Sequence, residues 1–254
     1  MRKVLFGSGS HAELPMIQEA KKAGWYVITT GTNKDGIGHG FADEYVYGDF
    51  SDKDFILNLA KEKQVDAIVS GCNDFSYIAT AYACEKLGLK GHDSYETSKI
   101  IHHKDEFRKM TRKLGIRTPL VFECKDIDDL SEILKDIKYP VLVKPVDLTG
   151  GKGVKVCGSF EEIIAAAVEA FRLTREDHII IEEYVFGTNH GASFILKDQH
   201  VIYGIFDDEQ YGLNKYLVLG ACSPSADTKE ETKKQLIRLS TCYMTNGLML
   251  EFMQ

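Results

Sequence analysis

The sequence predicts an α/β domain with a largely parallel sheet, followed by an α+β domain with an antiparallel sheet. Apolar runs alternate with amphipathic helical patterns up to about residue 93, as is typical of a doubly wound sheet. After residue 178, four strand-like runs follow one another with only short turns between them, which indicates antiparallel pairing. A chain of 254 residues is long enough for two domains. We therefore expect one domain over residues 1–93 and a second over residues 94–254.

The composition indicates a folded protein without a large electrostatic interface. Hydrophobic residues make up 44% of the chain and charged residues 27%, and the net charge of −7 argues against nucleic acid or an anionic membrane as a partner. The six cysteines form no C-x-x-C pair, and the N-terminus lacks the apolar region of a secretory signal. No segment approaches the roughly 18 apolar residues of a membrane span. We expect reduced cysteines, a cytoplasmic location, and no nucleic-acid or membrane partner.

In the first domain, each predicted strand leads into a predicted helix. Strands are expected at 4–7, 25–29 and 67–70, and helices at about 14–20, from Ser51 onward, and at about 75–87. Ser51 with Asp54 resembles a capping box. Asn73 and Asp74 follow the third strand, where an open α/β sheet places its ligands. A substrate contact there competes with the plainer interpretation of a helix cap.

The loop Gly7-Ser8-Gly9-Ser10-His11-Ala12 has the G-x-G-x-x-A spacing that can hold a dinucleotide pyrophosphate at a helix N-terminus. Such a site also needs an acidic residue for the ribose at the end of the second strand, where Thr29, Thr30 and Gly31 stand instead. A dinucleotide-dependent oxidoreductase is therefore the weaker alternative, and a tight turn or a loop for another ligand is the stronger one. The histidines show no metal-ligand spacing, so we expect no zinc site.

The second domain begins with helical patterns and ends with strands. A helix is expected near Asp105, ending at Gly115, and Asp126 opens a second one. Ser159 and Glu162 form a capping box for a third helix. The expected strands lie at 119–122, 179–183, 192–197, 201–206 and 216–221.

Residues 139–156, YPVLVKPVDLTGGKGVKV, combine a strand, a lysine and a glycine loop. An apolar run ends at Lys144, and the loop contains Gly150, Gly151, Lys152 and Gly153. Glycines allow successive backbone N–H groups to converge on an anion, and nearby lysines add positive charge. A second β-branched run follows the loop, whereas the glycines of a P-loop lead into a helix. The stretch therefore predicts a hairpin lid that covers nucleotide phosphates.

Five motifs in this order resemble the ATP-grasp superfamily: Lys104 in HHKDEFRKM, then YPVLVKP, DLTGGKGV, IIIEEYVFG and GLMLEFMQ. The chain looks most like carbamoyl-phosphate synthase large subunits and L-amino-acid ligases. The resemblance implies a Rossmann-like preceding domain over 1–93 and an ATP-grasp domain over 94–254, with a lid subdomain over about 118–186. Relatives continue into an acidic-x-Asn-Pro-Arg segment that binds metal, so we expect a chain truncated at Gln254 and an ATP-grasp domain incomplete at its C-terminus.

The resemblance also assigns roles to individual residues. Lys104 and Lys144 would bind the ATP phosphates, with Lys144 as the catalytic residue. The lid that closes over the phosphates would consist of Thr149, Gly150, Gly151, Lys152, Gly153 and Val154. The adenine pocket would consist of Glu182, Glu183, Tyr184 and Val185. Asn189 stands where relatives carry a glutamate for the ribose, and Glu251 matches a magnesium-binding carboxylate.

The implied function is that of an ATP-dependent ligase. It would activate a small-molecule carboxylate as an acyl phosphate and couple it to an amine substrate, with ATP and Mg²⁺ as cofactors and Mn²⁺ as an alternative metal. A homodimer is compatible with this class. Because the second metal-binding segment is absent, the chain as given would lack full activity, and a non-catalytic nucleotide-binding module is the main alternative.

Overall fold

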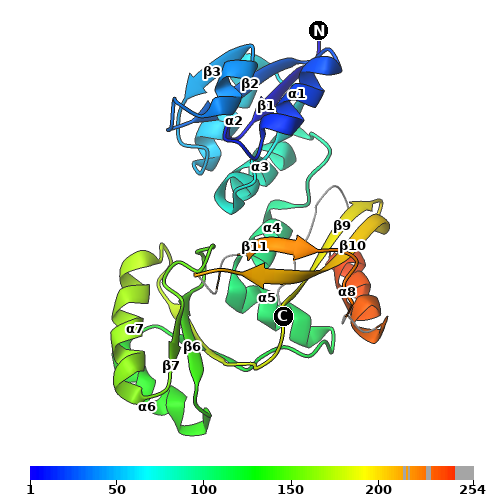
Figure 1. The fold of residues 1–254 in the computed structure, drawn as a ribbon. Helices are drawn as coiled ribbons and strands as arrows, with labels where there is room; N and C mark the ends of the chain where they lie inside the picture. The colour runs from blue at the N-terminus through cyan, green and yellow to red at the C-terminus, as the bar shows by residue number, and fades with distance from the viewer. Residues whose placement is uncertain (214–215, 217, 227–229, 244–254) are drawn as a thin grey trace. The chain divides into compact units, whose positions relative to one another are not determined.

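The computed structural model describes the chain except for residues 214–215, 217, 227–229 and 244–254 (Figure 1). Its described residues form two compact units, Met1–Lys99 and Ile100–Tyr243. The helix α4 (Tyr95–His102) runs across this division, whereas the sequence places the boundary at residue 93. The expected last strand and the expected metal ligand Glu251 lie outside the described residues.

The first unit contains a parallel sheet with the order β3-β2-β1-β4, as the sequence predicts. Its elements are β1 (Lys3–Phe6), α1 (Leu14–Lys22), β2 (Tyr26–Gly31), the 3₁₀ helix η1 (Ile37–Phe41), β3 (Glu44–Tyr47), α2 (Lys53–Lys63), β4 (Ala67–Val69) and α3 (Asp74–Leu87). The strand order reverses between β1 and β4. The loops that follow these two strands therefore meet at one edge of the sheet.

Helices cover both faces of this sheet because successive side chains of a strand point to opposite faces. Leu5 packs with the core under α2 and α3, whereas Val4 and Phe6 pack with Ile17 of α1. The structure identifies the residues that cap α2 and α3. Asp52, and not Ser51, caps α2, because its carboxylate accepts the first free N–H groups of the helix.

Asn73 caps α3, since its side-chain oxygen accepts hydrogen bonds from Phe75 N–H at 3.0 Å and from Ser76 N–H at 3.3 Å. The helix-cap interpretation of Asn73 is therefore confirmed. A cap of this kind holds the amide at the helix terminus. The caps of α2 and α3 both come from residues next to the loops at the carboxyl edge of the sheet.

The second unit begins with α5 (Lys104–Lys113) and an antiparallel sheet with the order β5-β8-β6-β7. Its strands are β5 (Val121–Cys124), β6 (Val141–Pro145), β7 (Lys155–Cys157) and β8 (Ile179–Glu183). Helix α7 (Phe160–Leu173), capped by Ser159, covers one face. The helix expected from Asp126 is broken into η2 (Ile127–Asp129), α6 (Leu130–Ile133) and η3 (Leu134–Asp136).

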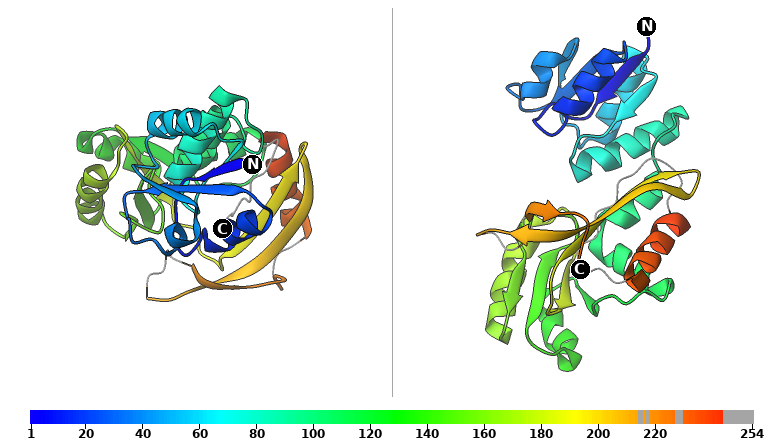
Figure 2. Two further views of the ribbon diagram at one scale, coloured as in Figure 1. Left: turned by 90° about the horizontal axis from the view of Figure 1, so that it is seen from above. Right: turned by 45° about the vertical axis from the view of Figure 1, so that its right-hand side comes forward.

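A second antiparallel sheet has the order β11-β10-β9. It consists of β9 (His190–Lys197), β10 (His200–Tyr211) and β11 (Val218–Cys222). Figures 1 and 2 both show α8 (Glu230–Tyr243) beside β9 and β10. The antiparallel pairing is predicted correctly, but β8 belongs to the other sheet. Among the described residues, no helix is long and apolar enough to cross a bilayer.

Candidate active site

A buried carboxylate between two cations lies at the centre of the β5-β8-β6-β7 sheet. Glu182 of β8 faces β6 in the register Leu142↔Glu182. Its Oε1 accepts a hydrogen bond from Arg108 Nε at 2.7 Å, and its Oε2 is in contact with Lys144 Nζ. The Glu182 side chain is only 2% exposed and that of Lys144 is 12% exposed. We call Arg108, Lys144 and Glu182 the buried triad.

The charges of the buried triad depend on one another. Burial alone would raise the pKa of Glu182, but the attraction of Lys144 and Arg108 outweighs it and lowers the pKa. Glu182 is therefore held as an anion. Burial lowers the pKa of Lys144, Arg108 acts in the same direction, and Glu182 opposes both. The triad carries one more positive than negative charge, which suits the approach of a polyanion.

Lys104 connects the first turn of α5 to the start of the glycine loop. Its backbone N–H donates to Val146 O at 3.2 Å, and its Nζ donates to Val146 O at 3.3 Å and to Leu148 O. Asp147, which is buried, accepts hydrogen bonds from Thr174 Oγ1 at 2.6 Å and from Arg175 N at 3.0 Å. The base of the loop is therefore fixed on two sides.

The glycine loop itself is open at its tip. Gly150, Gly151 and Gly153 have φ angles of +64°, +72° and +72°, values that favour glycine over any residue with a side chain. Lys152 N donates to Thr149 O at 3.4 Å, and Thr149, Gly150 and Lys152 are exposed. The loop joins the antiparallel strands β6 and β7, so the chain forms the hairpin that the sequence predicts.

The segment after Glu182 forms the end of β8 and the turn into β9. Glu183 N–H donates to Leu120 O at 2.9 Å, and its carboxylate accepts from Leu120 N at 3.2 Å. Tyr184 stacks edge-on against Phe186 at 4.8 Å between ring centroids, and Val185 is 60% exposed. The backbone oxygen of Asn189 accepts a hydrogen bond from Glu209 N–H at 3.1 Å. This segment offers apolar surface and backbone groups, which suit a flat heteroaromatic ring.

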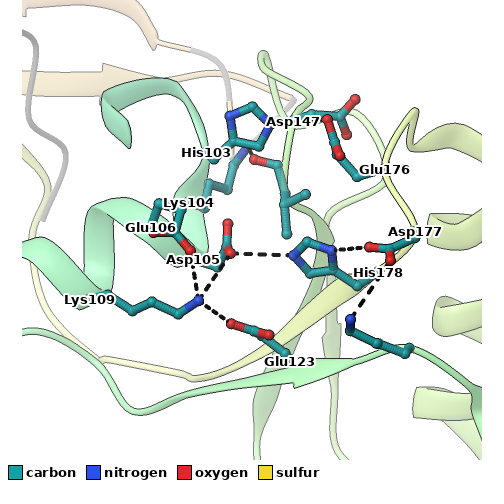
Figure 3. A network of polar contacts seen from close by, with 12 residues as sticks. His103, Lys104, Asp105, Glu106, Lys109, Glu123, Asp147, Glu176, Asp177 and His178 are labelled. Carbon is teal, nitrogen blue, oxygen red and sulfur yellow. Dashed lines mark hydrogen bonds and ion pairs between the residues drawn. The ribbon is translucent and has the colours of Figure 1, made fainter. Parts of the chain in front are cut away.

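An ionic network anchors α5 next to Lys104 (Figure 3). Asp105 is buried and lies 3.3 Å from His178 Nε2, just before β8. Lys109 Nζ lies 2.7 Å from Glu106, 3.6 Å from Asp105, and in contact with Glu123 of β5. Oxygens of these three carboxylates lie within 4.8 Å of one another, as metal ligands would. Hydrogen bonds to Glu106 and Glu123 raise the pKa of Lys109, so its ammonium stays charged and already occupies the position between these carboxylates.

The glycine loop of the first unit has a different environment. The Glu13 carboxylate accepts hydrogen bonds from Ser10 N at 2.8 Å, from Ser10 Oγ at 2.6 Å and from Cys72 N at 2.6 Å. Burial alone would raise the pKa of Glu13, but these bonds outweigh it and lower the pKa. The backbone donors at this edge of the sheet are thus satisfied by an internal anion.

His39 occupies the other side of this loop. A Cβ atom added at Gly9 would lie 2.2 Å from His39 Nδ1, and Gly9 O accepts a hydrogen bond from Gly38 N at 2.8 Å. A pyrophosphate at this loop would have to displace the imidazole and meet the carboxylate of Glu13. Together with the missing ribose acid, this arrangement argues against the dinucleotide-dependent oxidoreductase.

The sequence motifs bring Lys104, Lys144, Glu182 and residues 149–154 into one unit, but they do not indicate Arg108. Arg108 follows Lys104 by four residues on α5, so both side chains lie on the same helix face. This four-residue spacing is the sequence feature that could have indicated Arg108 as a site residue. The pairing of Arg108 with Glu182 spans 74 positions of the chain and depends on the tertiary fold.

Part of the chain is similar to a known ATP-binding domain. Residues 103–205 match the model of the carbamoyl-phosphate synthase L chain, ATP binding domain. The chain is 29% identical over 220 residues to a 5-formaminoimidazole-4-carboxamide-1-(beta)-D-ribofuranosyl 5'-monophosphate synthetase of Methanosphaera stadtmanae. The matched stretch covers 81% of this chain and 57% of the relative. It thus spans less than two thirds of that relative.

Two solved structures share the fold. The biotin carboxylase domain of Hydrogenobacter thermophilus 2-oxoglutarate carboxylase, in complex with MgADP, ADP and bicarbonate, has a TM-score of 0.79 and 21% identity over 99% of this chain and 60% of its own. An L-amino acid ligase from Bacillus licheniformis has a TM-score of 0.71 and 20% identity over 95% of this chain and 59% of its own. Residues 103–205 are thus similar to the ATP binding domain of the carbamoyl-phosphate synthase L chain, and the chain shares the fold of these two structures.

Proposed function

We propose that this chain is the ATP-binding part of a ligase that activates a carboxylate as an acyl phosphate and couples it to an amine. The observation that carries the proposal is the buried triad on the sheet whose strands β6 and β7 carry the glycine loop. Lys104 lies at the base of the same loop. Lysines and glycine amides provide the charge and the donors that a triphosphate requires.

The reaction would proceed in two transfers. A carboxylate oxygen of the substrate attacks the γ-phosphorus of ATP, the bond to the bridging oxygen breaks, and ADP leaves. The amine then attacks the acyl carbon, inorganic phosphate leaves, and the amine loses a proton. Both steps depend on positioning and charge neutralisation, which Lys144 and the loop 149–154 would supply by holding the phosphates and excluding water.

The proposal also assigns residues to the adenine, the ribose and the metal. Glu182 to Val185 would face the adenine, and Asn189 the ribose. Bound Mg²⁺, or Mn²⁺ in its place, would neutralise phosphate charge, and Glu251 is the carboxylate that the resemblance assigns to it, outside the described residues. The substrates would be a small carboxylate and an amine, in a cytoplasmic protein that can form a homodimer.

Calorimetry with Mg-ATP tests the nucleotide site. We expect Lys144→Ala to weaken binding at least tenfold, about 1.4 kcal/mol, because it removes a nearly buried cation from the phosphate position. Arg108 remains beside Glu182 in this variant, so the carboxylate keeps a partner and the fold is preserved. Lys138→Ala removes an exposed lysine from the residues just before β6 and serves as the charge control. Equal affinities of wild type and Lys144→Ala would refute the phosphate assignment.

The coupled reaction needs a separate test. Amino acids and other small carboxylates, each with an amine, are screened for ATP-dependent phosphate release by the full-length protein. Binding of ATP without release for any pair would favour a nucleotide-binding module over a ligase.

A further inference from the structure

We infer that Arg108 is a positioning residue that keeps Glu182 paired when Lys144 turns from Glu182 to the phosphates of ATP. The inference rests on the proposed function, because it concerns the state of the buried triad during nucleotide binding. The two carboxylate oxygens of Glu182 contact different cations. Oε1 lies 2.7 Å from Arg108 Nε, and Oε2 is in contact with Lys144 Nζ.

In this structure, Lys144 is already paired with an anion. Its ammonium contacts Glu182 and is only 12% exposed. To bind a phosphate oxygen, Lys144 has to exchange one anion for another. The Glu182 carboxylate cannot follow it or turn to water, because it is 2% exposed and lies on a central strand of the sheet. The Lys144–Glu182 ion pair must therefore break before Lys144 can bind a phosphate of ATP.

An ionised carboxylate left alone at this depth would be costly, and the cost would fall on ATP binding. Arg108 prevents it. Its guanidinium donates from α5, independently of β6, so the bond to Oε1 can persist while Lys144 moves. Arginine stays charged at all relevant pH values, which suits this role better than a titratable group. Among the described residues, Arg108 and Lys144 are the cations that lower the pKa of Glu182.

Without Arg108, the exchange would take a different course. Glu182 would be paired with Lys144 alone, and this neutral pair would have to break. The carboxylate would then either stay charged without a partner or take up a proton. Both courses weaken ATP binding, and the second makes it depend on proton uptake.

The experiment is calorimetry with Mg-ATP at pH 7 in two buffers of different ionisation enthalpy. For Arg108→Met we expect at least tenfold weaker binding than wild type and a larger net proton uptake. Arg108→Lys should recover part of the affinity. Lys113→Met, which removes an exposed cation of the same helix, should bind as wild type does. In a Glu182→Gln background, Arg108→Met should change affinity less than twofold, because no carboxylate remains to be paired.

Distinct results separate the possible failures. No binding to the wild type would refute the proposed function itself. If the wild type binds and Arg108→Met binds equally well without extra proton uptake, Arg108 has no such role. An equal loss in both backgrounds would mean that Arg108 acts on the nucleotide directly, which also overturns the inference. If Arg108→Met does not fold, the extra proton uptake is measured in Arg108→Gln, which also removes the charge, and its absence there counts against the inference.

Discussion

The two units of the chain each place a glycine-rich loop after a β-strand, yet the two loops differ in what surrounds them. Around the loop after β1, the Glu13 carboxylate accepts hydrogen bonds from Ser10 N–H of this loop and from Cys72 N–H of the loop after β4, and His39 fills the space beside Gly9. The loop between β6 and β7 has exposed residues at its tip and cations at its base. Glycine spacing predicts where a backbone can approach an anion, and the neighbouring side chains decide whether an external anion finds room.

The difference is also one of charge. In the first unit, an acidic side chain satisfies the donors, so a phosphate would meet a negative charge. In the second unit, the buried acidic side chain Glu182 is balanced by Arg108 and Lys144. The same residue type therefore has opposite consequences for a phosphate ligand in the two places.

The largest effect on this comparison is expected from Glu13→Ala. Removal of the buried carboxylate leaves the N–H groups of Ser10 and Cys72, whose hydrogen bonds to it are part-buried, without their acceptor, and we expect a loss of about 3 kcal/mol in the free energy of unfolding of the first unit. Trp25, the single tryptophan of the chain, reports on this unit by fluorescence during urea unfolding. Affinity for Mg-ATP should not change. A loss below about 0.5 kcal/mol would show that the internal anion is dispensable.

The same carboxylate predicts a pH dependence. The pKa of Glu13 is lowered from 4.5 in the folded state, so the folded protein binds fewer protons there than the unfolded chain. Its stabilisation is present above pH 4.5 and is lost as the pH falls through the lowered value. The difference in stability between wild type and Glu13→Gln should therefore shrink in acid.

A smaller contrast is expected from alanine at one glycine in each loop. Gly9→Ala would place Cβ 2.2 Å from the His39 ring and should cost about 2–3 kcal/mol. Gly150→Ala meets no atom within 4 Å, so only the φ of +64° opposes it, at about 1 kcal/mol. Urea unfolding checks both values. Equal costs would mean that the loops are equally crowded, contrary to the comparison.

Local sequence signals predicted most of the fold because strands and helices alternate clearly. They missed β3 (EYVY), which has only four residues, and α4 (YETSKIIH), which has only eight. The helix from Asp126 is capped as predicted, but its chain switches between 3₁₀ and α geometry. In the site, the lysines and the glycine loop were readable from motifs. The Arg108–Glu182 pair and the Asp105–His178 pair join distant segments, and no local pattern encodes them.

Hydrogen–deuterium exchange with and without Mg-ATP tests the central claim most directly, because it compares both glycine loops in one experiment. We expect the amides of residues 149–154 to become protected when Mg-ATP binds, since they would donate to phosphate oxygens or be covered by them. The amides of residues 8–13 should exchange at the same rate in both states. Protection at residues 8–13 with no change at residues 149–154 would contradict the account.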